Sequence, residues 1–254
     1  KCARTGCIVS KGSNARPAAT VILLRPSAPT GFQVFLTRRP EGMRFLGGMY
    51  CFPGGSVNQE DSSPRMMARC SGVSPQQARK IIGAQFRPQA ALGFWIAAIR
   101  ELFEETGIFL AVRDSGTPGS IEAMQSHRLV EKHAVLIAKS LSFCELLESE
   151  NLYCNASALA YFSHWQTPAQ NALRFDTRFF LTVLPQAQTP LPSSYEVIHS
   201  LWLTPDRAIQ LFERGELPLI FPTFASLRTL ADFDTLESLF EELSHGSAVA
   251  SGAR

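Results

Sequence analysis

The sequence lacks the bulk features of a membrane-spanning or nucleic-acid-binding protein. No apolar run approaches the roughly 18 residues that cross a bilayer, and the longest candidate, ALGFWIAAI at 91–99, runs directly into Arg100. The net charge is only +2 over 254 residues, so no general attraction to nucleic acid or to a membrane surface is expected. The first residues also lack the basic-then-apolar shape of a secretory signal. We therefore expect a soluble cytoplasmic protein, or an organelle-matrix protein if the source is eukaryotic.

Cysteine-based metal sites and repeat architectures are also missing. The 6 cysteines are scattered, no CxxC pair occurs, and no Cys/His cluster has zinc spacing, which favours reduced intracellular thiols. Neither an internal repeat nor a low-complexity tract is present. A hydrophobic content of 45% with 18% charged residues is typical of a globular protein. We expect one domain over 18–244, with flexible tails at 1–17 and 245–254 and helical inserts at about 62–88 and 120–151.

The most informative segment is RELFEETGI at 100–108. Glu101, Glu104 and Glu105 stand at i, i+3 and i+4, so they share one face of a helix. Like charges at this spacing repel unless a cation offsets them. Carboxylate oxygens are the ligands that Mg²⁺ and Mn²⁺ prefer. Alternatively, the cluster is a solvated acidic helix face in which Arg100 pairs with Glu104.

The helix that carries these glutamates is predicted over 89–106. Pro88 stands at its start and Gly107 follows its end, which are the usual positions of proline and glycine at helix ends. Its first half is nearly all apolar, so it is expected in the core. Such a helix anchors its acidic end rigidly at a cleft.

The remaining pattern predicts a mixture of strands and helices. A hairpin is expected from AATVILLR (18–25) and FQVFLTRR (32–39). Further strands are expected at 49–52, 108–112, 158–168, 172–185 and 195–205. Further helices are expected at 75–83, 121–140, 142–151, 205–215, 222–231 and 234–244.

Three segments carry additional predictions. Gly54 and Gly55 form either an ordinary tight turn or a turn that lets a phosphate or metal approach the backbone. The basic insert at 62–88 is either a solvated cap or a segment that contacts an anionic ligand. His127 and His133 fall six residues apart, which does not place them on one helix face, so both are interpreted as surface residues.

Taken in order, these segments resemble the Nudix hydrolases, whose motif is G-x5-E-x7-R-E-U-x-E-E-x-G-U with U a bulky apolar residue. The second half of this Nudix box matches at every position, from Arg100 to Ile108. The first half fits Gly55 with Asp61 in place of glutamate. Between Asp61 and Arg100 lie 38 residues (100 − 61 − 1) where the motif has seven, so an insertion splits the box. A split box, with LTRRPEGMRFLGGMYCFPGG, HWQTP, RFDTRFFL and WLTPDRAI, is similar to the coenzyme A diphosphatase-like Nudix enzymes of peroxisomes and mitochondria and their bacterial relatives.

The resemblance implies an α+β or α/β Nudix fold, with a mixed β-sheet core between helices and extra helical insertions. It implies Mg²⁺- or Mn²⁺-dependent hydrolysis of a diphosphate in a small nucleoside diphosphate derivative, with coenzyme A or acyl-CoA favoured. The alternatives are another diphosphate (NADH, ADP-ribose or a nucleotide sugar) or a non-catalytic Nudix-fold binding module. The expected assembly is a monomer or homodimer.

Site roles follow from the same resemblance. The metal ligands are expected to be Glu101, Glu104, Glu105 and the backbone of Gly55. Catalytic roles are assigned to Glu101, Glu105, Arg100 and Glu196, with Arg100 holding the glutamates and the general base left open among the acids. Substrate contacts are expected from Arg38, Arg39, Gly54 and Arg174. The role of Asp61 is left open, because the insertion displaces it from its usual spacing.

Overall fold

A computed structural model describes residues 15–29, 31–43, 46–113, 127–191, 197–244 and 251–252. Glu196, most of the predicted N-terminal tail and residues 121–126 of the helix predicted at 121–140 therefore lie outside the described residues. Of the predicted C-terminal tail, only Ser251–Gly252 are described, and they form β11 beside His164 and Trp165. No helix in these ranges is long and apolar enough to cross a membrane.

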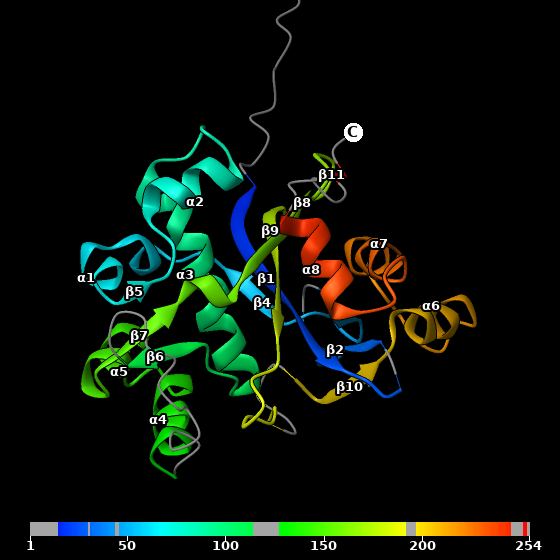
Figure 1. Cartoon of the computed structure of the whole chain (residues 1–254), viewed down its shortest axis with the longest axis horizontal. Coiled ribbons are helices and arrows are strands. Elements are labelled where there is room, and N and C mark those ends of the chain that lie inside the picture. Colours follow the sequence, from blue (N-terminus) through cyan, green and yellow to red (C-terminus); the bar gives the residue numbers. More distant parts are fainter. Residues whose placement is uncertain are drawn as a thin grey trace, which may run out of the picture.

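A mixed β-sheet forms the centre of the molecule (Figure 1). The predicted hairpin is confirmed, because β1 (Arg16–Pro26) pairs antiparallel with β2 (Phe32–Arg38). β1 also pairs in parallel with β9 (Phe175–Val183) along its whole other edge. The sheet order is β10-β2-β1-β9-β8-β11, where β8 is Ala160–Gln166 and β10 is His199–Leu203. The strand predicted at 195–205 is thus shorter than expected in the described chain.

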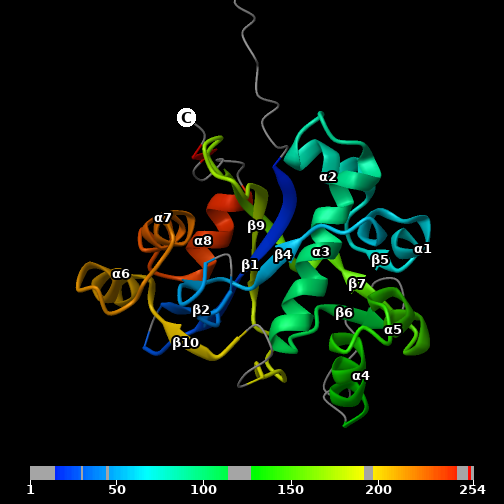
Figure 2. The same ribbon diagram turned by 180° about the vertical axis from the view of Figure 1, so that it is seen from behind.

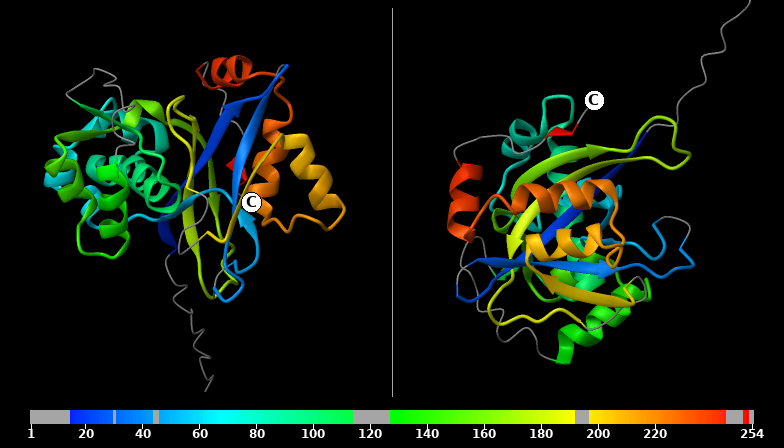
Figure 3. Two further views of the ribbon diagram at one scale, coloured as in Figure 1. Left: turned by 90° about the horizontal axis from the view of Figure 1, so that it is seen from below. Right: turned by 90° about the vertical axis from the view of Figure 1, so that its right-hand side faces the viewer.

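Helices cover both faces of this sheet, as the view from below shows (Figure 3). Alternate residues of β1 point to opposite sides, so Val21 and Leu23 join one core and Ile22 and Leu24 the other. The first core is built largely on α3 (Pro88–Thr106). The second lies under α6 (Pro205–Glu213), α7 (Phe221–Leu230) and α8 (Leu236–Ser244). The fold is the predicted mixed sheet between helices.

The helix ends follow the sequence signals closely. Pro88 occupies the first turn of α3, and Gly107 ends it in the left-handed conformation at φ 73°, with its N–H bonded to the Phe103 carbonyl. Ser142 caps the start of α5 (Phe143–Ser149) through a reciprocal capping box with Glu145. The helix predicted at 121–140 is described as α4 (His127–Ile137).

A second, three-stranded sheet lies beside α3, seen from behind in Figure 2. Its order is β5-β7-β6, from Cys70–Ser71, Leu152–Asn155 and Ala111–Arg113. The strand predicted at 108–112 therefore starts later than expected. Residues 108–110 are buried instead, and the Leu110 carbonyl accepts from the Asn155 N–H at 3.0 Å.

The insert at 62–88 is part of the core rather than a detachable cap. It contains α1 (Pro64–Met67), β5 and α2 (Pro75–Ile82), and it follows a short 3-10 turn, η1 (Glu60–Ser62). Met66, Ala78 and Ile82 are buried in the same core as α3. The insert is therefore built into the domain through its apolar side chains.

The arginines of the insert bind neighbouring segments. Arg65 donates from Nε to Glu148 of α5 at 2.8 Å. Arg69 donates to Asn151 at 3.3 Å, and Arg79 donates to the Ala84 carbonyl at 2.9 Å. The first two contacts attach the insert to the segment of α5 and β7, whereas the third lies within the insert. They favour a structural role for these three arginines over contact with an anionic ligand.

Candidate functional site

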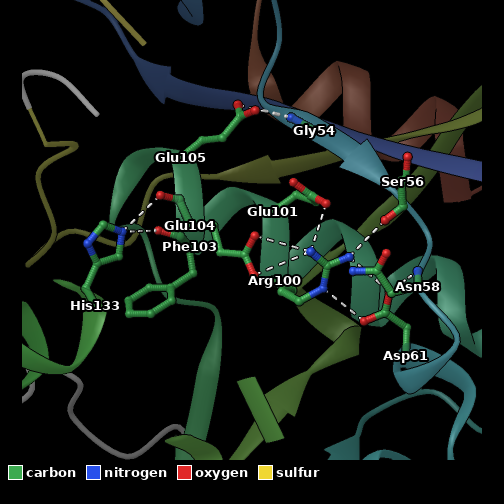
Figure 4. Close-up of polar contacts among 10 residues, drawn as sticks. All are labelled: Gly54, Ser56, Asn58, Asp61, Arg100, Glu101, Phe103, Glu104, Glu105 and His133. Atoms are coloured by element: carbon green, nitrogen blue, oxygen red, sulfur yellow. Dashed lines mark hydrogen bonds and ion pairs between the residues drawn. The ribbon is translucent and has the colours of Figure 1, made fainter. Parts of the chain in front are cut away.

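The site is mounted on the C-terminal third of α3. From Ala91 to Ile99 every residue of this helix is buried, so the helix is fixed in the core before the charged residues begin. Arg100, Glu101, Glu104 and Glu105 then follow within its last two turns (Figure 4). No lysine or arginine lies in the last turn. The predicted mounting of the glutamates on a buried helix is confirmed.

Asp61 and Arg100 meet across the insertion. The guanidinium donates from Nε to Asp61 Oδ1 and from Nη2 to Asp61 Oδ2, both at 3.0 Å (Figure 4). Asp61 is 2% exposed and also accepts from the Asn58 N–H at 2.7 Å. Arg100 Nη2 donates to the Ser56 carbonyl at 2.9 Å. Asp61, whose role the sequence left open, therefore fixes both Arg100 and the loop that follows the glycines.

The remaining nitrogen of Arg100 faces the glutamates. Nη1 donates to Glu101 Oε1 at 2.8 Å and lies 3.3 Å from Glu104 Oε2. Burial lowers the pKa of Arg100, but Asp61, Glu101 and Glu104 outweigh it and hold that pKa above its ordinary value. Arg100 is thus a permanent cation that orients carboxylates, as expected from the sequence.

Glu101 lies against Gly55. A Cβ at position 55 would stand 2.5–2.6 Å from the carboxyl carbon and both carboxyl oxygens of Glu101, so a larger residue there would displace this carboxylate. Burial raises the pKa of Glu101 to about 7, and the charge of Glu104 adds to this while Arg100 opposes it. The approach of a phosphate or metal to this glycine backbone stays a prediction.

Glu105 points to the other glycine. Its Oε2 accepts from the Gly54 N–H at 3.3 Å, and the residue is buried (Figure 4). Gly54 belongs to β4 (Gly54–Ser56), which pairs with β1. A Cβ there would stand 2.4 Å from the Ala19 carbonyl oxygen. The two glycines are therefore constrained by different neighbours. Gly54 packs against the backbone of β1, and Gly55 packs against the carboxylate of Glu101.

Arg39 lies at the same end of the site as Glu105. Both act on the thiol of Cys51 in β3 (Tyr50–Cys51): burial and the charge of Glu105 raise its pKa, Arg39 lowers it, and the net value is about 11. The structure thus brings Arg39 near the glutamates.

Two other predicted substrate arginines contact neighbouring loops. Arg38 donates to the Gly48 carbonyl at 3.2 Å and to Glu41 at 3.1 Å. Arg174 donates to the Thr167 carbonyl at 3.2 Å, at the turn between β8 and β9. These contacts give both side chains a place in the fold. Glu196 lies outside the described residues.

The donor set suits a hard divalent cation. Within the described ranges, no three His, Cys, Asp or Glu side chains converge as a preformed metal site. The reason is visible in the contacts, because Glu101 and Glu104 face Arg100 whereas Glu105 faces Gly54. Even so, the carboxyl groups of Asp61, Glu101 and Glu104 surround one guanidinium near the negative end of a helix, and a fourth carboxyl group, that of Glu105, lies in the last turn of the same helix. Carboxylate oxygens with this excess of negative charge are the ligands that Mg²⁺ and Mn²⁺ favour.

His133 is a residue that the sequence interpretation got wrong. Expected at the surface, it is only 9% exposed, and its Nε2 lies 3.0 Å from the carbonyl oxygens of both Phe103 and Glu104 (Figure 4). Its ring also meets Phe103 edge-on, with centroids 5.1 Å apart. The spacing to His127 gave no hint of this, because the partner is the end of another helix.

Comparisons with known proteins agree with this geometry. The family model of the NUDT19 Nudix domain matches residues 8–230. The chain belongs to this Nudix family. It is 28% identical over 267 residues to the acyl-coenzyme A diphosphatase NUDT19 of Gallus gallus, covering 88% of this chain and 70% of the relative. The Homo sapiens protein of the same name is 26% identical over 264 residues, covering 93% and 70% respectively.

A solved Nudix hydrolase has the same fold. The structure from Alicyclobacillus acidocaldarius superposes with a TM-score of 0.67 at 25% identity, covering 93% of this chain and 99% of that chain. The resemblance read from the sequence is confirmed, and the chain is a Nudix hydrolase. Its Nudix box is the split segment that Asp61 and Arg100 rejoin.

Proposed function

We propose that this Nudix hydrolase cleaves the diphosphate of coenzyme A or acyl-CoA with Mg²⁺ or Mn²⁺, releasing a phosphopantetheine fragment and 3′,5′-ADP. The observation that carries the proposal is the set of three glutamates at the end of α3, with Glu101 against Gly55, Glu105 bonded to the Gly54 N–H and Glu104 beside Arg100. The substrate class is supported by the similarity to the acyl-coenzyme A diphosphatases NUDT19 of Gallus gallus and Homo sapiens. One water molecule is added across the P–O–P linkage, so each product keeps one phosphoryl group of the broken bond.

The glutamates would hold the divalent ion, together with the backbone at Gly55. When bound, such an ion neutralises phosphate charge and makes a bound water more acidic. Arg100, fixed by Asp61, keeps Glu101 and Glu104 oriented and does not need to touch substrate. Glu105 and Glu101 are the candidates for general base among the described residues, and Glu196 is a third candidate that the structure does not describe.

Arg39 is our first choice for a substrate phosphate contact. It acts on the same Cys51 thiol as Glu105, so it lies at the glutamate end of the site. The Gly54 backbone offers close approach for the same phosphates. Arg38 and Arg174 are weaker choices, because both side chains donate hydrogen bonds to neighbouring loops. A guanidinium is well suited to phosphate because it donates two parallel hydrogen bonds.

The alternatives differ in what they turn over. NADH, ADP-ribose and nucleotide sugars share the diphosphate and differ in the groups attached to it. A non-catalytic binding module would bind ligand without turnover, but it has no need for all three box glutamates, and all three are present.

The decisive experiment is a mass-spectrometric product screen. The purified chain is incubated with Mg²⁺ or Mn²⁺ and with CoA, acetyl-CoA, NADH, ADP-ribose and UDP-glucose in parallel. We expect 3′,5′-ADP from the CoA substrates and little product from the others. Turnover of another diphosphate with CoA species untouched would overturn the substrate, and no turnover with either metal would overturn the enzyme proposal.

A pair of matched variants separates site from charge. Glu105→Gln removes one proposed ligand charge, whereas Glu213→Gln removes the same charge from the exposed end of α6. We expect turnover to fall by at least about a hundredfold in the first, in line with the weight of metal-held charge in catalysis. The second variant should match the parent. Equal loss in both would mean that net charge, not the site, matters.

A further inference from the structure

The C-terminal end of α3 combines negatively charged side chains with the negative end of the helix dipole. The last carbonyls of any helix lack partners within the helix and carry the negative end of its dipole. In α3 this end also carries Glu104 and Glu105, with no basic residue in the last turn. Negative charge at this end destabilises a helix, so the final turn tends to fray unless other groups hold it.

Three segments supply the missing donors. The Gly107 N–H donates to the Phe103 carbonyl at 2.8 Å, and the Leu191 N–H donates to the Thr106 carbonyl at 2.8 Å. His133 Nε2 lies 3.0 Å from the carbonyl oxygens of Phe103 and Glu104. Two of these donors are backbone groups, and His133 is the side chain.

The chemistry fixes the tautomer of His133. Both neighbours of Nε2 are carbonyl oxygens, which only accept, so Nε2 carries a hydrogen and donates. The helix that presents it, α4, lies outside the Nudix box and is anchored by Leu136 in the core shared with α3. The donor is thus delivered by a separately anchored element.

We propose that His133 is a positioning residue for the metal-binding glutamates of the Nudix box. By holding the carbonyls of Phe103 and Glu104, it keeps the last turn of α3 helical, and so keeps Glu104 and Glu105 on the face that they share with Glu101. This rests on the proposed function in so far as these glutamates bind a divalent ion. The insert at about 120–151 thereby contributes to the site, because α4 acts on the glutamates through the backbone of α3.

The test compares three variants. His133→Leu removes the donor while keeping a buried side chain. His133→Gln restores a donor, because the glutamine amide nitrogen stands the same number of bonds beyond Cβ as Nε2. Leu136→Ala is the matched control: it weakens the packing of the same helix and leaves the hydrogen bonds to α3 in place.

Three quantities are measured for the parent and each variant. They are Mn²⁺ affinity by electron paramagnetic resonance titration, hydrogen exchange of the Gly107 amide in metal-free protein, and unfolding in urea. We expect His133→Leu to weaken Mn²⁺ binding by about tenfold, the lower limit for residues that act behind a metal ligand. Exchange of the Gly107 amide should accelerate in the same variant. His133→Gln should recover most of both losses.

Each outcome decides the matter. The inference stands if Leu136→Ala, although less stable, keeps the parent's Mn²⁺ affinity and Gly107 exchange. It is wrong if His133→Leu binds Mn²⁺ like the parent, or if Leu136→Ala loses as much affinity as His133→Leu. A parent that binds no Mn²⁺ would instead overturn the metal dependence in the proposed function, while the exchange data would still report on the helix end.

Discussion

Asp61 is the residue whose removal tests the assembly of the site most directly. Asp61→Ala deletes a carboxylate that accepts two hydrogen bonds from Arg100, at 3.0 Å each, and one from the Asn58 N–H at 2.7 Å. It leaves Arg100 buried, with its contacts to Glu101, Glu104 and the Ser56 carbonyl. Asp61→Asn keeps one acceptor oxygen and loses the charge.

The magnitude follows from burial. Removing one partner of a buried ion pair typically lowers the free energy of unfolding by about 3–5 kcal/mol. Asp61 is 2% exposed and Arg100 6%, so water does not readily replace the lost contacts. We expect a loss in this range for Asp61→Ala. For Asp61→Asn about 2 kcal/mol is expected, because one neutral acceptor remains.

The assay is urea unfolding of the parent, Asp61→Ala, Arg100→Met and the double variant at one pH. A coupling free energy of about 2–3 kcal/mol is expected, as for contacting residues in one buried network. Glu148→Ala, which breaks the exposed pair with Arg65, is the control and should lose much less stability. Coupling below about 0.5 kcal/mol, a value seen for distant sites, would refute the view that this contact holds the box together.

Three further predictions use other features of the site and sheet. Gly55→Ala should abolish turnover with little loss of stability, because its Cβ meets the movable carboxylate of Glu101, whereas Gly54→Ala should destabilise the fold, because its Cβ meets backbone. Turnover and urea unfolding are measured for both variants, and equal effects of the two substitutions would contradict this prediction. The pKa of the Cys51 thiol is raised to about 11, chiefly by burial, so this cysteine should resist iodoacetamide at pH 8 in the folded protein and react in urea. Peptide mass mapping measures the labelling, and rapid labelling of the folded protein would contradict the prediction. Burial raises the pKa of Asp176, but its contacts with His164 and Arg178 outweigh this and lower it. Its contribution to stability is therefore complete above about pH 4 and is lost as pH falls through the lower folded value. The difference in unfolding free energy between parent and Asp176→Asn should therefore shrink below about pH 4, and a difference that stays constant down to pH 2.5 would contradict the assignment.

Local sequence signals predicted the scaffold of the site well. Pro88 and Gly107 bounded α3, and the segments 18–25 and 32–39 gave the hairpin of β1 and β2. These features depend on near neighbours in the chain, which is why one sequence suffices to find them. The same is true of the glutamate spacing, which gave the shared helix face.

Contacts between distant segments were the part that sequence could not give. The basic composition of the insert suggested either a solvated cap or a segment that contacts an anionic ligand, but Met66 and Ile82 make it part of the core. His133 was placed at the surface because its partners, two backbone carbonyls of another helix, have no signature in side-chain spacing. Glu41 and Thr167, which engage Arg38 and Arg174, are likewise found only from the folded chain.

The contact between Asp61 and Arg100 makes the insertion a closed loop whose two ends meet at one point. Lengthening such a loop from seven residues to 38 adds only about 1.5 kcal/mol of closure entropy, since the penalty grows with the logarithm of length. The buried side chains of the insert can offset a penalty of this size. A segment that begins at Asp61 and ends at Arg100 can change in length and sequence, while the contact between these two residues keeps the two halves of the Nudix box together. The split box is therefore a position where evolution can add new surface next to a catalytic centre without rebuilding it.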